Sequence, residues 1–173
     1  MTNSNGTTPH KVIDNPNPHH FITGGENATP LEVIGSTATD KLVIVMVGLP
    51  ATGKTHIAKR ICRFLNFFHD IDSQIFNVGD YRRKLCGEKM PASFFDPQNA
   101  DGLSQRKMAC DAALKDMLEY MNKPDVRVAV YDATNSTKER RDYLAQRIQD
   151  ANVNAKIMYI ESICDNEEVR NNV

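Results

Sequence analysis

The segment from Gly48 to Thr55, Gly-Leu-Pro-Ala-Thr-Gly-Lys-Thr, constrains the fold more than any other part of the sequence, because it fits G-x-x-x-x-G-K-[ST]. A continuous apolar run, Leu42–Val47, precedes it and is typical of a strand buried on both faces of a parallel sheet. Apolar residues at helical spacing follow, from Lys54 to Phe68. A strand, a glycine-rich loop and a helix in this order predict an α/β nucleotide-binding fold.

Each part of this loop has a chemical use in holding a polyphosphate. The glycines allow the backbone to curl so that its N–H groups face an anion at the positive end of the following helix. Lys54 is then expected to reach the β- and γ-phosphates, and the Thr55 hydroxyl to ligate Mg²⁺. The simpler interpretation is a glycine turn that only starts a helix, but the pattern arises by chance in under about one chain in a hundred of this length.

Strands and helices alternate along the rest of the chain. The apolar patterns predict three further strands (Gln74–Val78, Val126–Asp132 and Ala155–Glu161), a long helix (Ala100–Met121) and an irregular segment (Tyr81–Asn99). Ser136 and Glu139 fit an S-x-x-E capping box, with Asn135 in the same turn, so we expect another helix from Ser136 to Ala151. This alternation predicts a three-layer α/β fold with a mostly parallel sheet and right-handed crossovers.

The two long helices should bury one stripe each. In the helix after the glycine-rich loop, the stripe comprises Ile57, Ile61, Phe64, Leu65 and Phe68. In the helix from Ala100 to Met121, it comprises Cys110, Ala113, Leu114, Met117 and Met121.

Residues 1–40 are rich in Asn, Thr, Gly, Pro and His, and we expect a disordered leader because their few apolar residues cannot offset the entropy of ordering. His19 and His20 are expected to be solvated rather than metal ligands. A net charge of −1 favours neither nucleic acid nor a membrane as partner. The four cysteines form no C-x-x-C pair, and no apolar segment resembles a signal peptide, so a reduced, cytoplasmic protein is expected.

Asp132 ends a predicted strand and begins the motif Asp-Ala-Thr-Asn. Ligands of open α/β sheets bind at the carboxyl ends of strands, so Asp132 and the glycine-rich loop should share one edge. A carboxylate there can hold Mg²⁺ or accept a proton from an attacking hydroxyl, and the sequence leaves both roles open. The alternative is an Asx-type turn that caps the next helix.

Five arginines are candidates for binding an anion. Arg82 and Arg83 follow the second predicted strand, Arg106 lies early in the long helix, and Arg140 and Arg141 lie in the first turn after the capping box. A cation is unfavourable near a helix N-terminus, so Arg140 and Arg141 are easier to explain beside a bound anion. Arginine is also suited to gripping a phosphate through two hydrogen bonds. Each taken alone is more often a solvated surface residue, whereas three from distant segments make a phosphate clamp an equal alternative.

Five motifs together resemble the kinase half of the 6-phosphofructo-2-kinase/fructose-2,6-bisphosphatase family. They are, in chain order, VMVGLPATGKT, FNVGDYRR, RKMACDAALKDM, VYDATNSTKERR and YIESICD. The resemblance runs from Lys41 to the C-terminus. It implies a kinase that uses ATP and Mg²⁺ to convert fructose 6-phosphate into fructose 2,6-bisphosphate.

The resemblance also implies roles for individual residues. It assigns ATP to Gly48, Leu49, Pro50, Ala51, Thr52, Gly53, Lys54, Thr55 and His56, and the sugar phosphate to Arg82, Arg106, Thr134 and Arg140. It makes Lys54 and Asp132 catalytic, with Thr55 and Asp132 beside the metal. Cys164 matches a site cysteine of the family, although the residues alone favour a small apolar core residue at a strand end.

Two departures from the family pattern concern the site. Thr52 stands where the family has an arginine, which should tune ATP binding rather than abolish it, because backbone donors form most of the cradle. Asp96, in the stretch FFDPQN, reverses a charge that the family tends to have, which weakens the case for tight sugar-phosphate binding.

The family's kinase domain continues past the position of Val173, and the bisphosphatase half has no counterpart here. We therefore expect an incomplete kinase domain over residues 41–173. Two alternatives to a working 2-kinase stay open: a catalytically weak or regulatory nucleotide-binding fragment, and a P-loop kinase of another small metabolite. The sequence also leaves open whether the chain forms a homodimer or pairs with a full-length relative.

Overall fold

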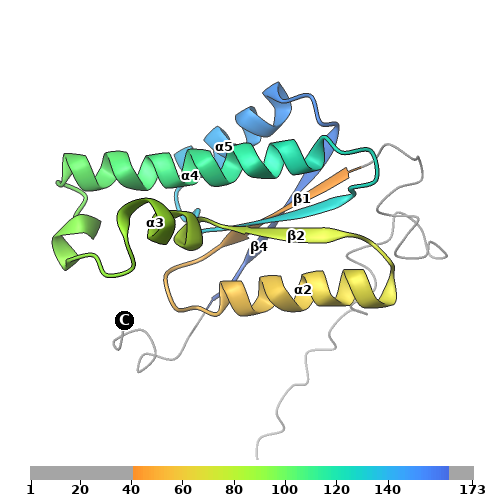
Figure 1. Cartoon of the computed structure of the whole chain (residues 1–173), viewed down its shortest axis with the longest axis horizontal. Helices are drawn as coiled ribbons and strands as arrows, with labels where there is room; N and C mark the ends of the chain where they lie inside the picture. The colour runs from red at the N-terminus through yellow and green to blue at the C-terminus, as the bar shows by residue number, and fades with distance from the viewer. Residues whose placement is uncertain (1–40, 164–173) are drawn as a thin grey trace, which may run out of the picture.

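The computed structural model describes residues 41–163 (Figure 1). The elements are β1 (Lys41–Val47), α2 (Lys54–Phe68), β2 (Ser73–Asn77), α3 (Val78–Cys86), the 3-10 helix η2 (Ala92–Phe95), α4 (Ala100–Met121), β3 (Val128–Asp132), α5 (Lys138–Asp150) and β4 (Ala155–Glu161). The predicted leader, His19, His20 and Cys164 lie outside the described residues.

The four strands form one sheet in the order β2-β3-β1-β4, and each described pair is parallel. Helix α2 covers one face, and α4 and α5 cover the other (Figure 1). This arrangement confirms the predicted three-layer α/β fold. Within the described range, no helix is both long enough and apolar enough to cross a membrane.

The alternating side chains of β1 divide the core between the two layers. Val43 and Val45 pack in the cluster that includes α4 and α5, whereas Ile44 and Met46 pack against α2. Because both faces are covered, β1 is apolar without interruption from Leu42 to Val47, as the sequence predicted.

The stripe predicted for α4 is confirmed, since its five residues are all buried. The stripe predicted for α2 is only partly right, because Phe64 and Phe68 are 52% and 69% exposed. Helix α2 contacts the sheet through Ala58, Cys62 and Leu65, and the two phenylalanines lie beside that face, packed on each other with ring centroids 5.3 Å apart.

The segment expected to be irregular from Tyr81 to Asn99 is helical in part, because α3 extends to Cys86 and η2 covers Ala92–Phe95, whereas residues 87–91 and 96–99 are irregular. Strand β2 ends at Asn77, not at Val78, and α3 begins at once. The Asn77 side chain accepts a hydrogen bond from the Asp80 N–H at 3.1 Å and so caps the helix. A single asparagine therefore ends the strand and starts the helix.

The predicted capping box is wrong by one residue. Helix α5 begins at Lys138, and its N-cap is Thr137, whose hydroxyl accepts from the Arg140 N–H at 3.3 Å. Asn135, at a left-handed φ of 44°, turns the chain before the helix begins. The Arg141 guanidinium donates to the carbonyls of Asn135 and Ser136, which keeps both residues in that turn.

Candidate functional site

The carboxyl ends of three strands bring the main candidate residues to one edge. Asp132 at the end of β3 pairs with Met46 of β1 on one side and with Asn77 of β2 on the other. The glycine-rich loop leaves β1 one residue later, so it begins next to Asp132. This juxtaposition is the one that the strand pattern predicted.

The loop has the curled backbone that an anion cradle requires. Gly48, Ala51 and Gly53 have φ values of 137°, 58° and 86°, all positive. A positive φ at Ala51 is strained, and such strain gathers at functional sites. Helix α2 starts without a side-chain cap and without an acidic residue in its first turn, which leaves its N–H groups available to a phosphate.

The two glycines should differ in their tolerance of alanine. A Cβ on Gly48 would lie 2.5 Å from the carbonyl oxygen of Ser162, whereas a Cβ on Gly53 meets no atom within 4 Å. We expect Gly53→Ala to lower the free energy of unfolding by about 1–2 kcal/mol through strain alone, and Gly48→Ala by at least about 3 kcal/mol. Urea titrations of both variants check this, and an equal cost would contradict the close approach of Ser162.

Lys54 lies inside the loop, and only 8% of its surface is exposed. Its ammonium donates to the carbonyl oxygen of Leu49 and lies 3.5 Å from the Thr52 hydroxyl oxygen. Burial lowers the pKa of Lys54, and the nearby Asp132 carboxylate partly opposes that shift. An ammonium has three donors, so one N–H remains for a ligand.

Asp132 is the centre of a small polar cluster and is 2% exposed. The Thr55 hydroxyl donates to its Oδ2 at 2.6 Å, and the Asn77 amide donates to the same oxygen at 2.5 Å. The Asn77 amide also lies 3.1 Å from the Thr55 hydroxyl oxygen. Asn77 was not among the residues predicted for the site. Its signal was its place at a strand end, equivalent to that of Asp132.

This cluster suits Mg²⁺. The ion takes few protein ligands, one or two carboxylates beside waters and substrate phosphates, and Asp132 and Thr55 supply hard oxygen atoms. Among residues 41–163, no group of three or more His, Cys, Asp or Glu side chains could hold a metal ion. An all-protein metal cage is therefore not part of the described chain.

The turn after β3 is fastened to the start of the glycine-rich loop. The Gly48 N–H donates to the carbonyl of Thr134 at 2.9 Å, and the Asn135 amide donates to the carbonyl of Met46 at 2.8 Å. The Thr134 side chain is exposed. Thr134 is therefore placed beside the loop, with its hydroxyl accessible to a substrate.

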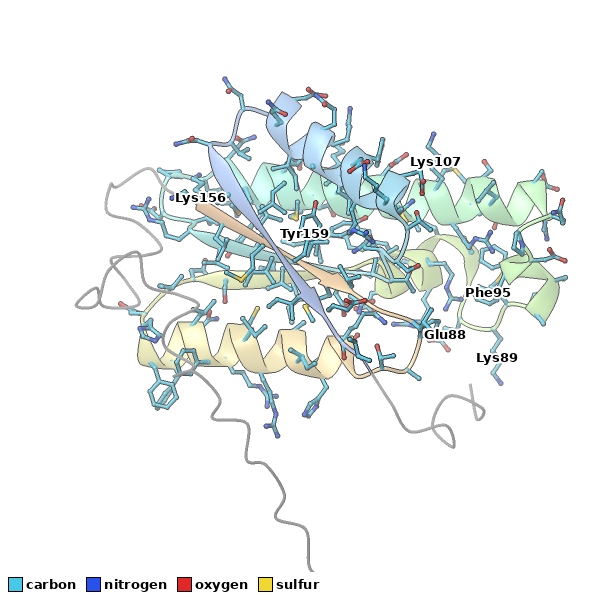
Figure 2. All side chains as sticks on the ribbon, turned by 180° about the vertical axis from the view of Figure 1, so that it is seen from behind. Glu88, Lys89, Phe95, Lys107, Lys156 and Tyr159 are labelled. Atoms are coloured by element: carbon cyan, nitrogen blue, oxygen red, sulfur yellow. The ribbon has the colours of Figure 1, made fainter. Side chains whose placement is uncertain are left out.

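Arg82 and Arg106 flank a pair of aromatic rings at the same end of the molecule. Arg82 lies over the Phe95 ring at 5.7 Å, Arg106 over the Phe94 ring at 5.9 Å, and the two rings are 5.1 Å apart. Arg106 also donates to the carbonyl of Phe94 at 2.7 Å. Figure 2 shows Phe95 and Glu88 at this end, beyond the strands.

Arg140 approaches α4 from the first turn of α5. It lies in electrostatic contact with Cys110 and Tyr131. Arg106 and Cys110 are four residues apart on α4, so Arg106 lies on the same face of that helix as the residue that Arg140 contacts. Burial raises the pKa values of Cys110 and Tyr131, so both are neutral at physiological pH.

Arg82, Arg106 and Arg140 differ from the nearby Arg83 in their ion pairing. Arg83 is ion-paired with Asp80 at 2.5 Å, whereas no described carboxylate forms an ion pair with Arg82, Arg106 or Arg140. Instead, backbone carbonyls, aromatic faces and neutral side chains hold the three in place. Arginines held without a neutralising acid are suited to an anionic ligand.

The other predicted residues are less informative. Leu49, Pro50, Ala51 and His56 are exposed around the loop. Asp96 is exposed, and its carboxylate accepts from the Gln98 N–H at 2.8 Å, which forms a local turn.

A hollow of about 760 Å³ lies elsewhere, over the C-terminal half of α2. Its lining includes Arg60, Arg63, Phe64, Phe67 and Phe68 and contains none of the predicted site residues. We place the site at the strand ends, because the polar groups suited to phosphate and metal converge there.

Comparison with known proteins identifies a matching family and several relatives that cover most of this chain. A family model described as 6-phosphofructo-2-kinase matches residues 31–173. The 6-phosphofructo-2-kinase/fructose-2,6-bisphosphatase 3 of Rattus norvegicus is 42% identical over 127 residues, covering 73% of this chain and 22% of the relative. The Caenorhabditis elegans 6-phosphofructo-2-kinase/fructose-2,6-bisphosphatase is 41% identical over 132 residues, covering 73% and 28%.

A relative from Saccharomyces cerevisiae, named fructose-2,6-bisphosphatase, is 41% identical over 130 residues, which cover 75% of this chain and 28% of the relative. The chain thus spans about a quarter of the length of the curated relatives it matches. Among solved structures, the crystal structure of APE1195 is similar with a TM-score of 0.55 and 18% identity, covering 78% of this chain and 69% of that one. This likeness concerns the fold alone.

Proposed function

Because this chain belongs to the 6-phosphofructo-2-kinase family, we propose that it transfers the γ-phosphoryl group of ATP to the 2-hydroxyl of fructose 6-phosphate. The products are ADP and fructose 2,6-bisphosphate. One observation carries the proposal: the loop that holds Lys54 beside Asp132 opens at the same end of the molecule as three arginines that form no ion pair with a carboxylate of residues 41–163. An acceptor that carries its own phosphate matches this arrangement.

ATP is proposed to bind with its phosphates in the curl from Gly48 to Thr55. Backbone N–H groups and the remaining donor of Lys54 hold the β- and γ-phosphates. Thr55 and Asp132 would hold Mg²⁺, with Asn77 orienting the carboxylate. When bound, Mg²⁺ neutralises charge on the phosphate oxygens.

The sugar phosphate is proposed to be gripped by Arg82, Arg106 and Arg140, with the Thr134 hydroxyl beside it. The 2-hydroxyl oxygen then forms a bond to the γ-phosphorus while the bond from that phosphorus to the β–γ bridging oxygen breaks. ADP leaves, and the hydroxyl proton passes to Asp132 or to water. Positioning supplies most of the rate, because the protein takes little part in the covalent chemistry.

The direct test incubates the purified chain with γ-labelled ATP, Mg²⁺ and fructose 6-phosphate, and separates the products. Label in fructose 2,6-bisphosphate is expected. The absence of this label would overturn the proposed transfer, and with ATP still bound it would favour nucleotide binding without transfer. Other sugar phosphates assayed in parallel would identify a kinase of a different small metabolite.

The arginines provide a sharper test of the acceptor site. Arg140→Ala is expected to raise the KM for fructose 6-phosphate at least tenfold and to leave the KM for ATP within twofold, because a charged hydrogen bond is worth about 1.5–3 kcal/mol. Arg83→Ala is the matched control, since Asp80 already neutralises Arg83. Equal effects of the two substitutions would show that the phosphate is held elsewhere.

A second candidate function is nucleotide binding without efficient transfer. Its support is the relative from Saccharomyces cerevisiae, which is similar over this same region but is named for the bisphosphatase alone. A chain of this kind would bind ATP and transfer no label, and it could act by pairing with itself or with a longer relative. In either case we propose a cytoplasmic protein, consistent with the free thiols of Cys62, Cys86 and Cys110.

A further inference from the structure

Ser162, which follows β4, touches the glycine-rich loop at three points. Its N–H donates to the carbonyl of Val47 at 2.8 Å, and its hydroxyl donates to the carbonyl of Thr52 at 2.5 Å. Its own carbonyl oxygen lies against Gly48, 2.5 Å from where a Cβ would be. One residue, 110 positions away from Thr52 along the chain, thus holds the start and the middle of the loop. Ser162 is 7% exposed.

The contact continues from Thr52 to the lysine. The Thr52 hydroxyl donates to the carbonyl of Leu49 at 2.9 Å, and the Lys54 ammonium donates to that same carbonyl. A line of hydrogen bonds therefore runs from Ser162 through Thr52 and Leu49 to Lys54. Ser162 holds the backbone carbonyl of Thr52, and the Thr52 hydroxyl in turn holds the Leu49 carbonyl that accepts the hydrogen bond from Lys54.

We infer that Ser162 is a positioning residue for the phosphate cradle, which sets the curl of the loop and the place of Lys54. This inference rests on the proposed function, because it assigns a means of holding ATP. The glycines of the loop tolerate their positive φ values, but Ala51, at a φ of 58°, does not favour the observed curl. The contacts of Ser162 with the start and the middle of the loop hold the N–H groups in place before ATP arrives and reduce the ordering cost of binding.

Of the contacts that Ser162 makes with the loop, the hydrogen bond of its hydroxyl is the one that a substitution can remove selectively. In Ser162→Ala the backbone contact to Val47 remains, but the carbonyl of Thr52 loses its donor. We expect the Kd for ATP to rise about tenfold, the consequence of losing one hydrogen bond to a partly buried group. Isothermal titration of the full chain with ATP and Mg²⁺ measures this.

Ser73 provides a matched control. It is also 7% exposed, and its hydroxyl bonds to the Asn66 side chain at 2.5 Å beneath α2, away from the loop. Ser73→Ala should lower the urea midpoint to a similar extent and leave the Kd for ATP within twofold. A role of Ser162 limited to stability would give the two variants the same Kd as the parent.

Two further variants keep the test decisive. Ser162→Thr retains the hydroxyl and should bind ATP within threefold of the parent. Ser162→Cys replaces it with a weak donor of similar size and should repeat the tenfold loss even where Ser162→Ala does not fold. Parent-like affinity in a folded Ser162→Cys or Ser162→Ala chain overturns the inference, whereas failure of the parent itself to bind ATP overturns the proposed function.

Discussion

Replacing Lys54 with methionine is expected to raise the Kd for ATP at least a hundredfold. The lysine is 8% exposed and its ammonium is bonded within the loop, so its charge is directed to the cradle rather than to solvent. Removing one member of a buried charge contact costs about 2–5 kcal/mol, and a hundredfold loss needs about 2.8 kcal/mol, which lies within that range. Isothermal titration with ATP and Mg²⁺ measures it.

Folding should not suffer in the same variant. Burial lowers the pKa of Lys54, so the unfolded chain binds this proton more tightly than the folded chain does. The charge therefore costs stability at neutral pH, and this cost is relieved as the pH rises through the lowered pKa towards the ordinary value. Methionine removes the cost, so we expect Lys54→Met to unfold at the same urea concentration as the parent or a higher one.

A second lysine of α2 tests whether the loss of ATP affinity is specific to Lys54. Lys59 is exposed on α2 and lies outside the loop, and Lys59→Met should leave the Kd for ATP within twofold. Near-normal affinity in Lys54→Met, or an equal loss in Lys59→Met, would remove the basis for assigning the loop to ATP.

The loop and Asp132 could be predicted from sequence because their determinants are local. A strand, two glycines and a lysine within about fifteen residues leave few backbone arrangements, and the carboxyl ends of parallel strands meet at one edge. The stripe of α4 was equally predictable, because a helix packed across a sheet buries one continuous face.

Asn77 and α3 could not be predicted in the same way. In sequence, Asn77 falls inside the predicted strand Gln74–Val78, and nothing marks it as a helix cap. Its two roles, capping α3 and donating to Asp132, depend on β2 lying next to β3, and that is a property of the sheet.

Two further features depend on tertiary structure in the same way. They are the exposure of Phe64 and Phe68 and the contact of Ser162 with the glycine-rich loop. Helical spacing identifies an apolar stripe, but how much of it is covered depends on the neighbouring layer. Nothing in the residues around Ser162 indicates that β4 ends against the loop. The pairing of β4 with β1 determines this contact.

Replacing Asp132 with alanine is expected to reduce the transfer rate at least a thousandfold while ATP stays bound. The carboxylate is 2% exposed and accepts from Thr55 and Asn77, so it is held at the edge where the phosphates are proposed to lie. Proton transfer by a positioned group contributes about 10²–10⁴-fold, and placement of the metal adds to this. The assay follows label from ATP into the sugar, with ATP binding measured separately.

Asp132→Asn separates charge from shape. The amide keeps the volume and one acceptor oxygen, so a loss equal to that of alanine would assign the effect to the negative charge. The Mg²⁺ dependence then distinguishes the two roles that the sequence left open. If Asp132 holds the ion, the Mg²⁺ concentration for half-maximal rate should rise in Asp132→Asn; if it accepts the proton, only kcat should fall. Activity that persists in both variants would reduce Asp132 to a structural acceptor for Thr55 and Asn77.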